Sequence, residues 1–230
     1  MAVRARIVLA ALSALMAGVA LGTPAMASGG ASDDRSIFHA GAAAGSGWSD
    51  CAAPITWTID VGGLTGHRAA QVVDDVAWAL RTWGARAHLA FVGGGSLRHG
   101  YDNNLDAAVP VDGRWRSRHL YVSVLTDEQS DYLGGSVAGV GTPTRVLLGA
   151  REIVAGSAVF RSDIVRAAGR QERRALILHE MGHSLGLTHS SDPSSVMYPL
   201  VSRRTLLGTG DVAAIRGLTR TCSAVVGPAA

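Results

Sequence analysis

The sequence predicts a single domain of the α+β class, with α-helices and β-strands mixed along the chain. Three observations support this fold class. Apolar and polar residues alternate over residues 55–59, as in a strand with one buried face. Residues 67–83 carry apolar side chains at helical spacing. Residues 171–187 form a second helical segment that carries two histidines one turn apart.

The first half of the domain is expected to alternate between strand and helix. A strand over 55–59 is followed by the helix over 67–83 and by a second strand over 88–92. Residues 93–113 are rich in Gly, Asn and Asp and are predicted to form a long loop, which is often functional or mobile. A third strand is predicted over 119–125. The apolar face of the helix comprises Val72, Val73, Val76, Leu80 and Trp83.

The second half contains the segments with the most distinctive patterns. Residues 134–141 form a stretch with regularly spaced glycines, and residues 153–160 are a strand candidate. The helix over 171–187 and a closing helix over 211–219 complete the prediction. No internal repeat is present, so one domain accounts for the pattern.

The segment HEMGHSLGLTH, residues 179–189, predicts a catalytic zinc site. On a helix, His179 and His183 lie on one face, where their ring nitrogens can bind one ion at about 2.0–2.1 Å. Glu180 lies beside that face, within reach of a water on the metal. Gly186 can adopt a positive φ and end the helix, which lets His189 approach as the third ligand. Three protein ligands leave a fourth position open, as in catalytic zinc sites.

The alternative is an amphipathic helix that carries histidines by chance. With eight histidines in 230 residues, about 0.005 occurrences of HExxH are expected by chance. The metal site is therefore the better interpretation.

Residues 194–199, SSVMYP, follow the motif and extend its pattern. Together, the two segments resemble the metzincin metalloproteases, which pair the long histidine motif with a Met-turn. Within that clan, the chain is most similar to bacterial matrixin-like peptidases. The resemblance implies a twisted mixed sheet with an active-site helix, a backing helix and a C-terminal helix that opens near Asp211. Met197 would form an apolar floor beneath the ligand rings, as structural support.

The resemblance also implies how a substrate binds. Residues 134–141 would form an edge strand along the upper rim of the cleft, where an extended polypeptide can pair with it. Pro199 stands where astacin-like and serralysin-like relatives have a zinc-binding tyrosine, so Tyr198 is not a predicted ligand. No set of spacings matches the second, structural zinc of animal matrixins.

The amino terminus predicts a secreted bacterial protein. Arg4 and Arg6 precede an apolar run over 7–21, and residues 25–27 (AMA) form a cleavage site, so residues 1–27 are predicted to be a Sec-type signal peptide. The run is shorter than the roughly 20 residues that a membrane span needs. Residues 28–50 are predicted to be flexible, and residues 51–230 to form the protease domain.

Cys51 and Cys222 lie near the two ends of the expected mature chain. Their even number and the oxidising compartment favour one disulfide. The alternative, drawn from the family resemblance, is that Cys51 binds the zinc and keeps the enzyme latent. Cys51 lacks the propeptide motif of animal members.

The charge pattern excludes a nucleic-acid partner. Without Arg4 and Arg6, 19 basic residues would face 18 acidic ones, and no basic cluster exceeds two residues. No membrane partner is expected after signal cleavage, and the sequence predicts no oligomeric state. Asp102, Asn103, Asn104 and Asp106 could bind Ca²⁺, although such residues also form ordinary turns.

The predicted function is zinc-dependent hydrolysis of peptide bonds. Zinc bound by three neutral imidazoles lowers the pKa of a water molecule to about 7. Glu180 would accept the proton of that water and deliver it to the departing amine. Two alternatives remain open: a secreted zinc-containing binding module without turnover, and a zinc hydrolase of a non-peptide amide.

Overall fold

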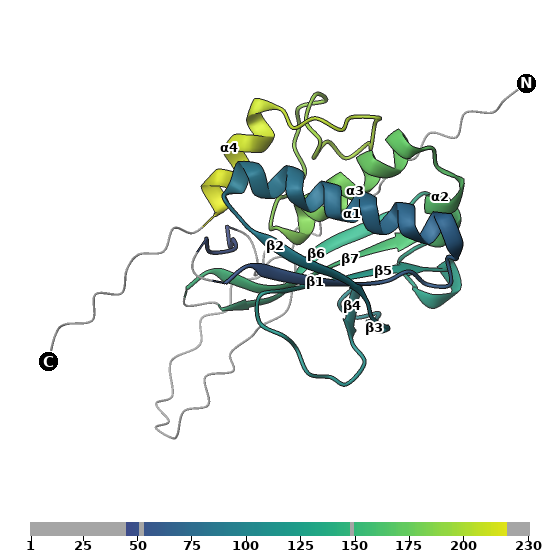
Figure 1. Ribbon diagram of the computed structural model, residues 1–230. Helices are drawn as coiled ribbons and strands as arrows, with labels where there is room; N and C mark the ends of the chain where they lie inside the picture. The colour runs from purple at the N-terminus through teal and green to yellow at the C-terminus, as the bar shows by residue number, and fades with distance from the viewer. Residues whose placement is uncertain (1–44, 51–52, 148–149, 220–230) are drawn as a thin grey trace, which may run out of the picture.

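A five-stranded sheet forms the centre of the computed structural model, which describes residues 45–50, 53–147 and 150–219 (Figure 1). The strand order is β2-β1-β5-β7-β6. Four strands are parallel, and β6 alone runs antiparallel, at the edge beside β7. The bounds are β1 (Ile55–Asp60), β2 (Phe91–Ser96), β5 (His119–Leu125), β6 (Gly139–Leu147) and β7 (Glu152–Arg161).

Helices cover one face of this sheet, and a small hairpin covers part of the other (Figure 1). The long α1 packs against α3, and α3 packs against β6 and β7. The helices are α1 (Gly66–Ala87), α2 (Ser162–Ala167), α3 (Arg170–Ser184) and α4 (Thr209–Leu218), with a 3-10 turn η1 (Asp127–Gln129). The hairpin consists of β3 (His99–Asp102) and β4 (Ala107–Pro110).

The apolar core lies between the sheet and the helices. Trp83 of α1, Leu178 of α3 and Phe160 of β7 are all buried there. A smaller cluster on the opposite face contains Tyr121 and Val159 and is covered by the hairpin. Burial on both faces explains why β5 is buried along its whole length. The predicted α+β fold class is confirmed.

The structure corrects several predicted elements. The segment 93–113, predicted to be a loop, contains the hairpin β3–β4. The strand predicted over 88–92 instead spans 91–96, because His88 adopts a left-handed conformation (φ 56°) that ends α1. β6 begins at Gly139, so only the last part of the stretch 134–141 is strand. Helix α3 ends at Ser184 rather than at residue 187.

The segment 45–49 belongs to the packed domain, although it was predicted to lie in a flexible stretch over 28–50. Trp48 is buried, and its indole N–H donates to the Ser184 carbonyl at the end of α3 (3.2 Å). Gly47 pairs with Glu152 at the start of β7. A composition rich in Gly and Ser predicts a flexible segment. Burial of the Trp48 side chain removes a large apolar surface from water, and this stabilises the segment in one ordered conformation.

Several predictions concern residues outside the described part of the chain. These are the signal peptide over 1–27, Cys51 and Cys222. Within the described residues, no helix has the length and apolar character required to cross a membrane.

Candidate metal centre

Helix α3 carries the first two histidines of the motif and is held firmly against α1. Most of its residues are buried, from Arg173 to Ser184. The Arg173 guanidinium donates to the Asp75 carboxylate of α1 at 2.7 Å, and both side chains are almost fully buried. Glu172 accepts from the Gly169 N–H and caps the helix start. The site therefore rests on a rigid element.

The three histidines of the motif meet at one point. Nε2 of His183 lies 3.1 Å from Nε2 of His179 and 3.2 Å from Nε2 of His189. Among the described residues, these three form the one group of three or more His, Cys, Asp or Glu side chains close enough to share a metal ion. Three Zn–N bonds of about 2.0–2.1 Å in tetrahedral geometry separate the nitrogens by about 3.3–3.4 Å. The observed spacing fits zinc.

The other ring nitrogens determine the tautomer of two of these histidines. Nδ1 of His179 donates to the Val196 carbonyl (2.8 Å), and Nδ1 of His183 donates to the Leu187 carbonyl (2.7 Å). Each Nε2 then presents a lone pair, and two lone pairs at 3.1 Å repel each other unless a cation lies between them. The donor set therefore suits a metal ion.

Burial keeps the three histidines of the motif neutral at neutral pH. It lowers the pKa of His179 to about 4 and that of His183 to about 3. The pKa of His189 is lowered for the same reason. Neutral imidazole is the form that binds metal, so no proton needs to be displaced at neutral pH.

The turn after α3 brings His189 to the other two rings. Gly186 has φ 102°, in the left-handed region that favours glycine. An added Cβ there would also lie 2.7 Å from the Ser46 carbonyl oxygen, so the position requires glycine for space as well. This geometry is the one expected for Gly186 from the sequence.

Met197 lies beneath the ligand helix, in the core. It is buried, and its thioether lies where a side chain on Gly182 would be. The Met197 carbonyl accepts from the Ser190 N–H at 2.9 Å, which ties the turn to the segment that follows His189. Gly182, which the sequence analysis did not single out, is the residue that lets Met197 approach α3.

Glu180 follows His179 on α3 and is buried, and no Arg of the described residues lies within ion-pair distance of it. It is 1% exposed, and neither carboxylate oxygen makes a hydrogen bond of ordinary geometry to a described residue. Burial raises the pKa of Glu180 to about 8, and the nearby Gly141 N–H opposes this only weakly. A buried carboxyl without a partner costs free energy, and such groups cluster at functional sites.

Strand β6 forms one wall beside Glu180. A Cβ on Gly139 would lie 3.0 Å from Cγ of Glu180, and one on Gly141 would collide with the Glu180 carbonyl. The two glycines thus allow the edge strand to lie directly against the active-site helix.

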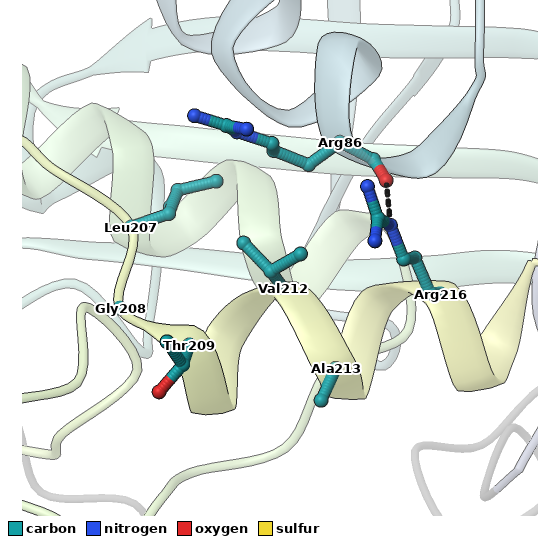
Figure 2. Close-up of a pocket in the computed structure, with 7 residues that line it drawn as sticks. All are labelled: Arg86, Leu207, Gly208, Thr209, Val212, Ala213 and Arg216. Atoms are coloured by element: carbon teal, nitrogen blue, oxygen red, sulfur yellow. Dashed lines mark hydrogen bonds between the residues drawn. The ribbon is translucent and has the colours of Figure 1, made fainter.

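Two hollows flank the elements that follow the histidine motif. A cavity of about 560 Å³ lies between the turn after α3 and α4, and His189, Asp192 and Met197 contribute to its lining. A second pocket, of about 400 Å³, lies between α1 and α4 (Figure 2). There the Arg216 guanidinium donates to the Arg86 carbonyl at 2.9 Å. The second pocket contains no residue of the histidine motif.

The remaining candidate residues lie elsewhere. His99 and His119 are on the hairpin face of the sheet, where the Thr58 hydroxyl lies 2.9 Å from Nε2 of each. In the predicted calcium segment, Asp106 accepts from the Tyr101 hydroxyl and Asn103 from the Asp131 N–H. Nothing among the described residues adds support for calcium there.

Sequence reasoning missed the role of Ser195 and the contacts of Asp211. The buried Asp211 carboxylate accepts from the Ser195 hydroxyl, the Val196 N–H (3.1 Å) and the Gly208 N–H (2.8 Å). The only sequence signal was the position of Asp211 at the start of the closing helix. Its partners lie up to 16 residues away and are set by the tertiary fold.

The chain is similar to known proteins over the region that contains this centre. Residues 141–219 match the family model of the matrixins. A matrilysin of Felis catus is 52% identical over 48 residues, 19% of this chain and 18% of that protein. A probable matrix metalloproteinase 095L of Invertebrate iridescent virus 3 is 50% identical over 44 residues, 19% of this chain and 12% of that protein.

The matched segments thus cover less than a fifth of each relative's length. The residues matched by the family model, 141–219, include all three histidines of the metal centre. The fold, the three converging histidines and the matrixin match over 141–219 together support a likeness of this chain to the metzincin-like metalloproteases.

Proposed function

We propose that the chain is a secreted zinc-dependent endopeptidase. The observation that carries this proposal is the set of three converging Nε2 atoms, together with the buried carboxyl of Glu180, the residue that follows His179 on α3. Among the described residues, Glu180 has no structural task that would explain its burial. A role as the base of the proposed metal site would explain why this carboxyl is buried.

Each residue of the site has a separate role in this proposal. His179, His183 and His189 hold the metal, which when bound supplies the Lewis acidity that activates water and polarises a peptide carbonyl. Glu180 takes the proton from the attacking water and returns it to the departing amine. Burial raises the pKa of Glu180 to about 8 without metal, so its role as a base requires that the bound cation lower this pKa and keep the carboxylate ionised at neutral pH.

The edge strand β6 provides a natural place for the substrate. It pairs with β7 on one side only, and it lies against α3 beside Glu180. An extended peptide added to its free edge would gain main-chain hydrogen bonds that do not depend on side-chain identity. We therefore expect polypeptide substrates in an extended conformation. The Sec-type signal peptide over 1–27 and the Cys51–Cys222 disulfide remain part of the proposal.

The decisive experiment measures casein cleavage by purified residues 28–230, with and without 1,10-phenanthroline. Glu180→Gln is the matched control, because it keeps the shape of the side chain and removes the base. We expect cleavage by the wild type, loss with chelator, and a decrease of at least about 100-fold in the variant at equal zinc content.

Cleavage that persists in Glu180→Gln would contradict the assigned base. A folded, zinc-loaded wild-type protein that cleaves neither casein nor a panel of unstructured proteins would favour the binding module. Hydrolysis of a small non-peptide amide in the same panel would favour the third interpretation.

A further inference from the structure

We infer that Ser195 and Asp211 form a hydrogen-bonded relay that positions His179 and strengthens its hold on the metal. Both are positioning residues, since they are linked to His179 through the main chain of Val196 and Met197. The inference rests on the proposed zinc site, but its test measures metal binding and does not depend on turnover.

The relay runs through one peptide group of the Met-turn. Nδ1 of His179 donates to the Val196 carbonyl at 2.8 Å. The N–H of the same peptide unit, that of Met197, donates to the Ser195 hydroxyl at 2.9 Å. That hydroxyl in turn donates to the Asp211 carboxylate. Imidazole, peptide, hydroxyl and carboxylate therefore form one continuous chain, with every proton pointing toward Asp211.

A second bond reinforces the same direction. The Val196 N–H donates to the other oxygen of the Asp211 carboxylate at 3.1 Å. The peptide groups on both sides of Val196 are thus held by one carboxylate. A peptide whose N–H is donated to an acceptor has a more negative carbonyl oxygen, which accepts more strongly from His179. This makes the Nε2 lone pair a better metal ligand.

Burial makes these interactions strong. Ser195 and Asp211 are 7% and 2% exposed, and His179 is fully buried. No Lys or Arg among the described residues lies within ion-pair distance of Asp211, so hydrogen bonds and the amino-terminal end of α4 stabilise its charge. A divalent cation bound by His179 would lie at the opposite end of this hydrogen-bonded relay from Asp211. Its positive charge would interact favourably with the carboxylate in a region of low dielectric constant.

A simpler role for Asp211 is to cap α4, because it also accepts from the Gly208 N–H at 2.8 Å. A substitution at Ser195 distinguishes the capping role of Asp211 from its role in the relay. Replacing Ser195 by alanine removes the hydroxyl between Met197 and Asp211 and leaves the cap in place. Ser194 offers a matched control, because its hydroxyl donates to the exposed Asp192 side chain and makes no hydrogen bond to the Met-turn or α4 among the described residues.

The experiment compares Ser195→Ala, Ser195→Thr and Ser194→Ala by competition for zinc with a chromophoric chelator. It also records the absorption of the cobalt-substituted proteins. We expect Ser195→Ala to bind zinc about 10-fold more weakly, in the range that outer-shell substitutions cause, with a shifted cobalt band. Ser195→Thr, which retains the hydroxyl, and Ser194→Ala should match the wild type.

The thermal midpoint of each metal-free protein provides the test of a purely structural role. A lower midpoint for Ser195→Ala with wild-type zinc affinity and cobalt absorption would overturn the relay. If Ser195→Ala does not fold, Asp211→Asn takes its place, since it keeps an acceptor for the cap and removes the charge. Unchanged zinc affinity in that folded variant would equally overturn the inference. Failure of the wild type to bind zinc at all would instead refute the proposed function.

Discussion

Gly141 shows how closely the edge strand and the active-site helix approach each other. A Cβ at this position would lie well inside contact distance of the Glu180 carbonyl oxygen, and 2.7 Å from its carbon. We expect Gly141→Ala to push β6 away from α3, to lower the free energy of unfolding by about 1–3 kcal/mol and to reduce peptidase activity.

The matched control for this prediction is Gly134→Ala, where a Cβ would meet nothing within 4 Å. Urea denaturation and casein cleavage measure the two effects. Equal stability and activity of Gly141→Ala and the wild type would show that the strand can move without cost.

His119 makes stability depend on pH at a place remote from the metal. Burial lowers its pKa to about 4, with smaller contributions from the charges of Arg116 and His99. As the pH falls below about 6.5, His119 is protonated in the unfolded chain, whereas in the folded protein it stays neutral until about pH 4. Stability is therefore full above about pH 6.5 and falls between about pH 6.5 and 4.

The contribution of His119 is isolated by the difference between the metal-free wild type and His119→Gln, which cannot titrate. We expect the wild type to lose up to about 3 kcal/mol relative to the variant over this pH range. Urea titrations at several pH values measure it. Parallel pH profiles for the two proteins would contradict the prediction.

At the scale of residues, the sequence predicted what lies within one turn of the motif and missed what lies beyond it. His179, His183 and Gly186 follow from the period and end of one helix, so local spacing was enough to predict their placement. The bond from Asp211 to Ser195 joins α4 to the Met-turn. No periodicity encodes such a contact, because it depends on how two elements pack.

The segment 45–49 is the element whose role differs most from expectation. Trp48 enters the core and donates to the Ser184 carbonyl, next to His183 in the chain. We expect Trp48→Ala to lower the free energy of unfolding by about 3–5 kcal/mol, since it leaves a cavity at the end of α3.

Trp48→Phe is the control for this prediction. It keeps most of the ring and removes the N–H donor, so the expected cost is about 1–3 kcal/mol. Urea denaturation of both variants provides the measurement. A Trp48→Ala protein as stable as the wild type would mean that residues 45–49 contribute little to the fold.

The elements that the sequence predicted well are those with a clear period. Strand β5 matches its predicted bounds, and β1 and α1 are extended by a few residues. The hairpin β3–β4 was missed because Gly, Asn and Asp dominate its turn, and because no period of the sequence shows that His99, Tyr101 and β4 pack on the sheet. Helix α2 is only six residues long, too short for periodicity to reveal.

At the scale of the whole molecule, the proposed metal binding would link the stability of several elements. The three proposed ligands come from α3 and from the turn after it, and the Met-turn and α4 are connected to them through hydrogen bonds. An ion that binds only the folded state stabilises it by about 4 kcal/mol when present at 1,000 times its dissociation constant.

We therefore expect that removing zinc with a chelator lowers the thermal midpoint by roughly 8–16 °C, at about 2–4 °C per kcal/mol for a protein of this size. Differential scanning calorimetry with and without added zinc measures the shift. Glu180→Ala keeps all three ligands and should show the full shift, whereas His189→Ala should show much less. Equal shifts in the two variants would remove His189 from the ligand set, because a residue that holds the ion must couple its affinity to folding.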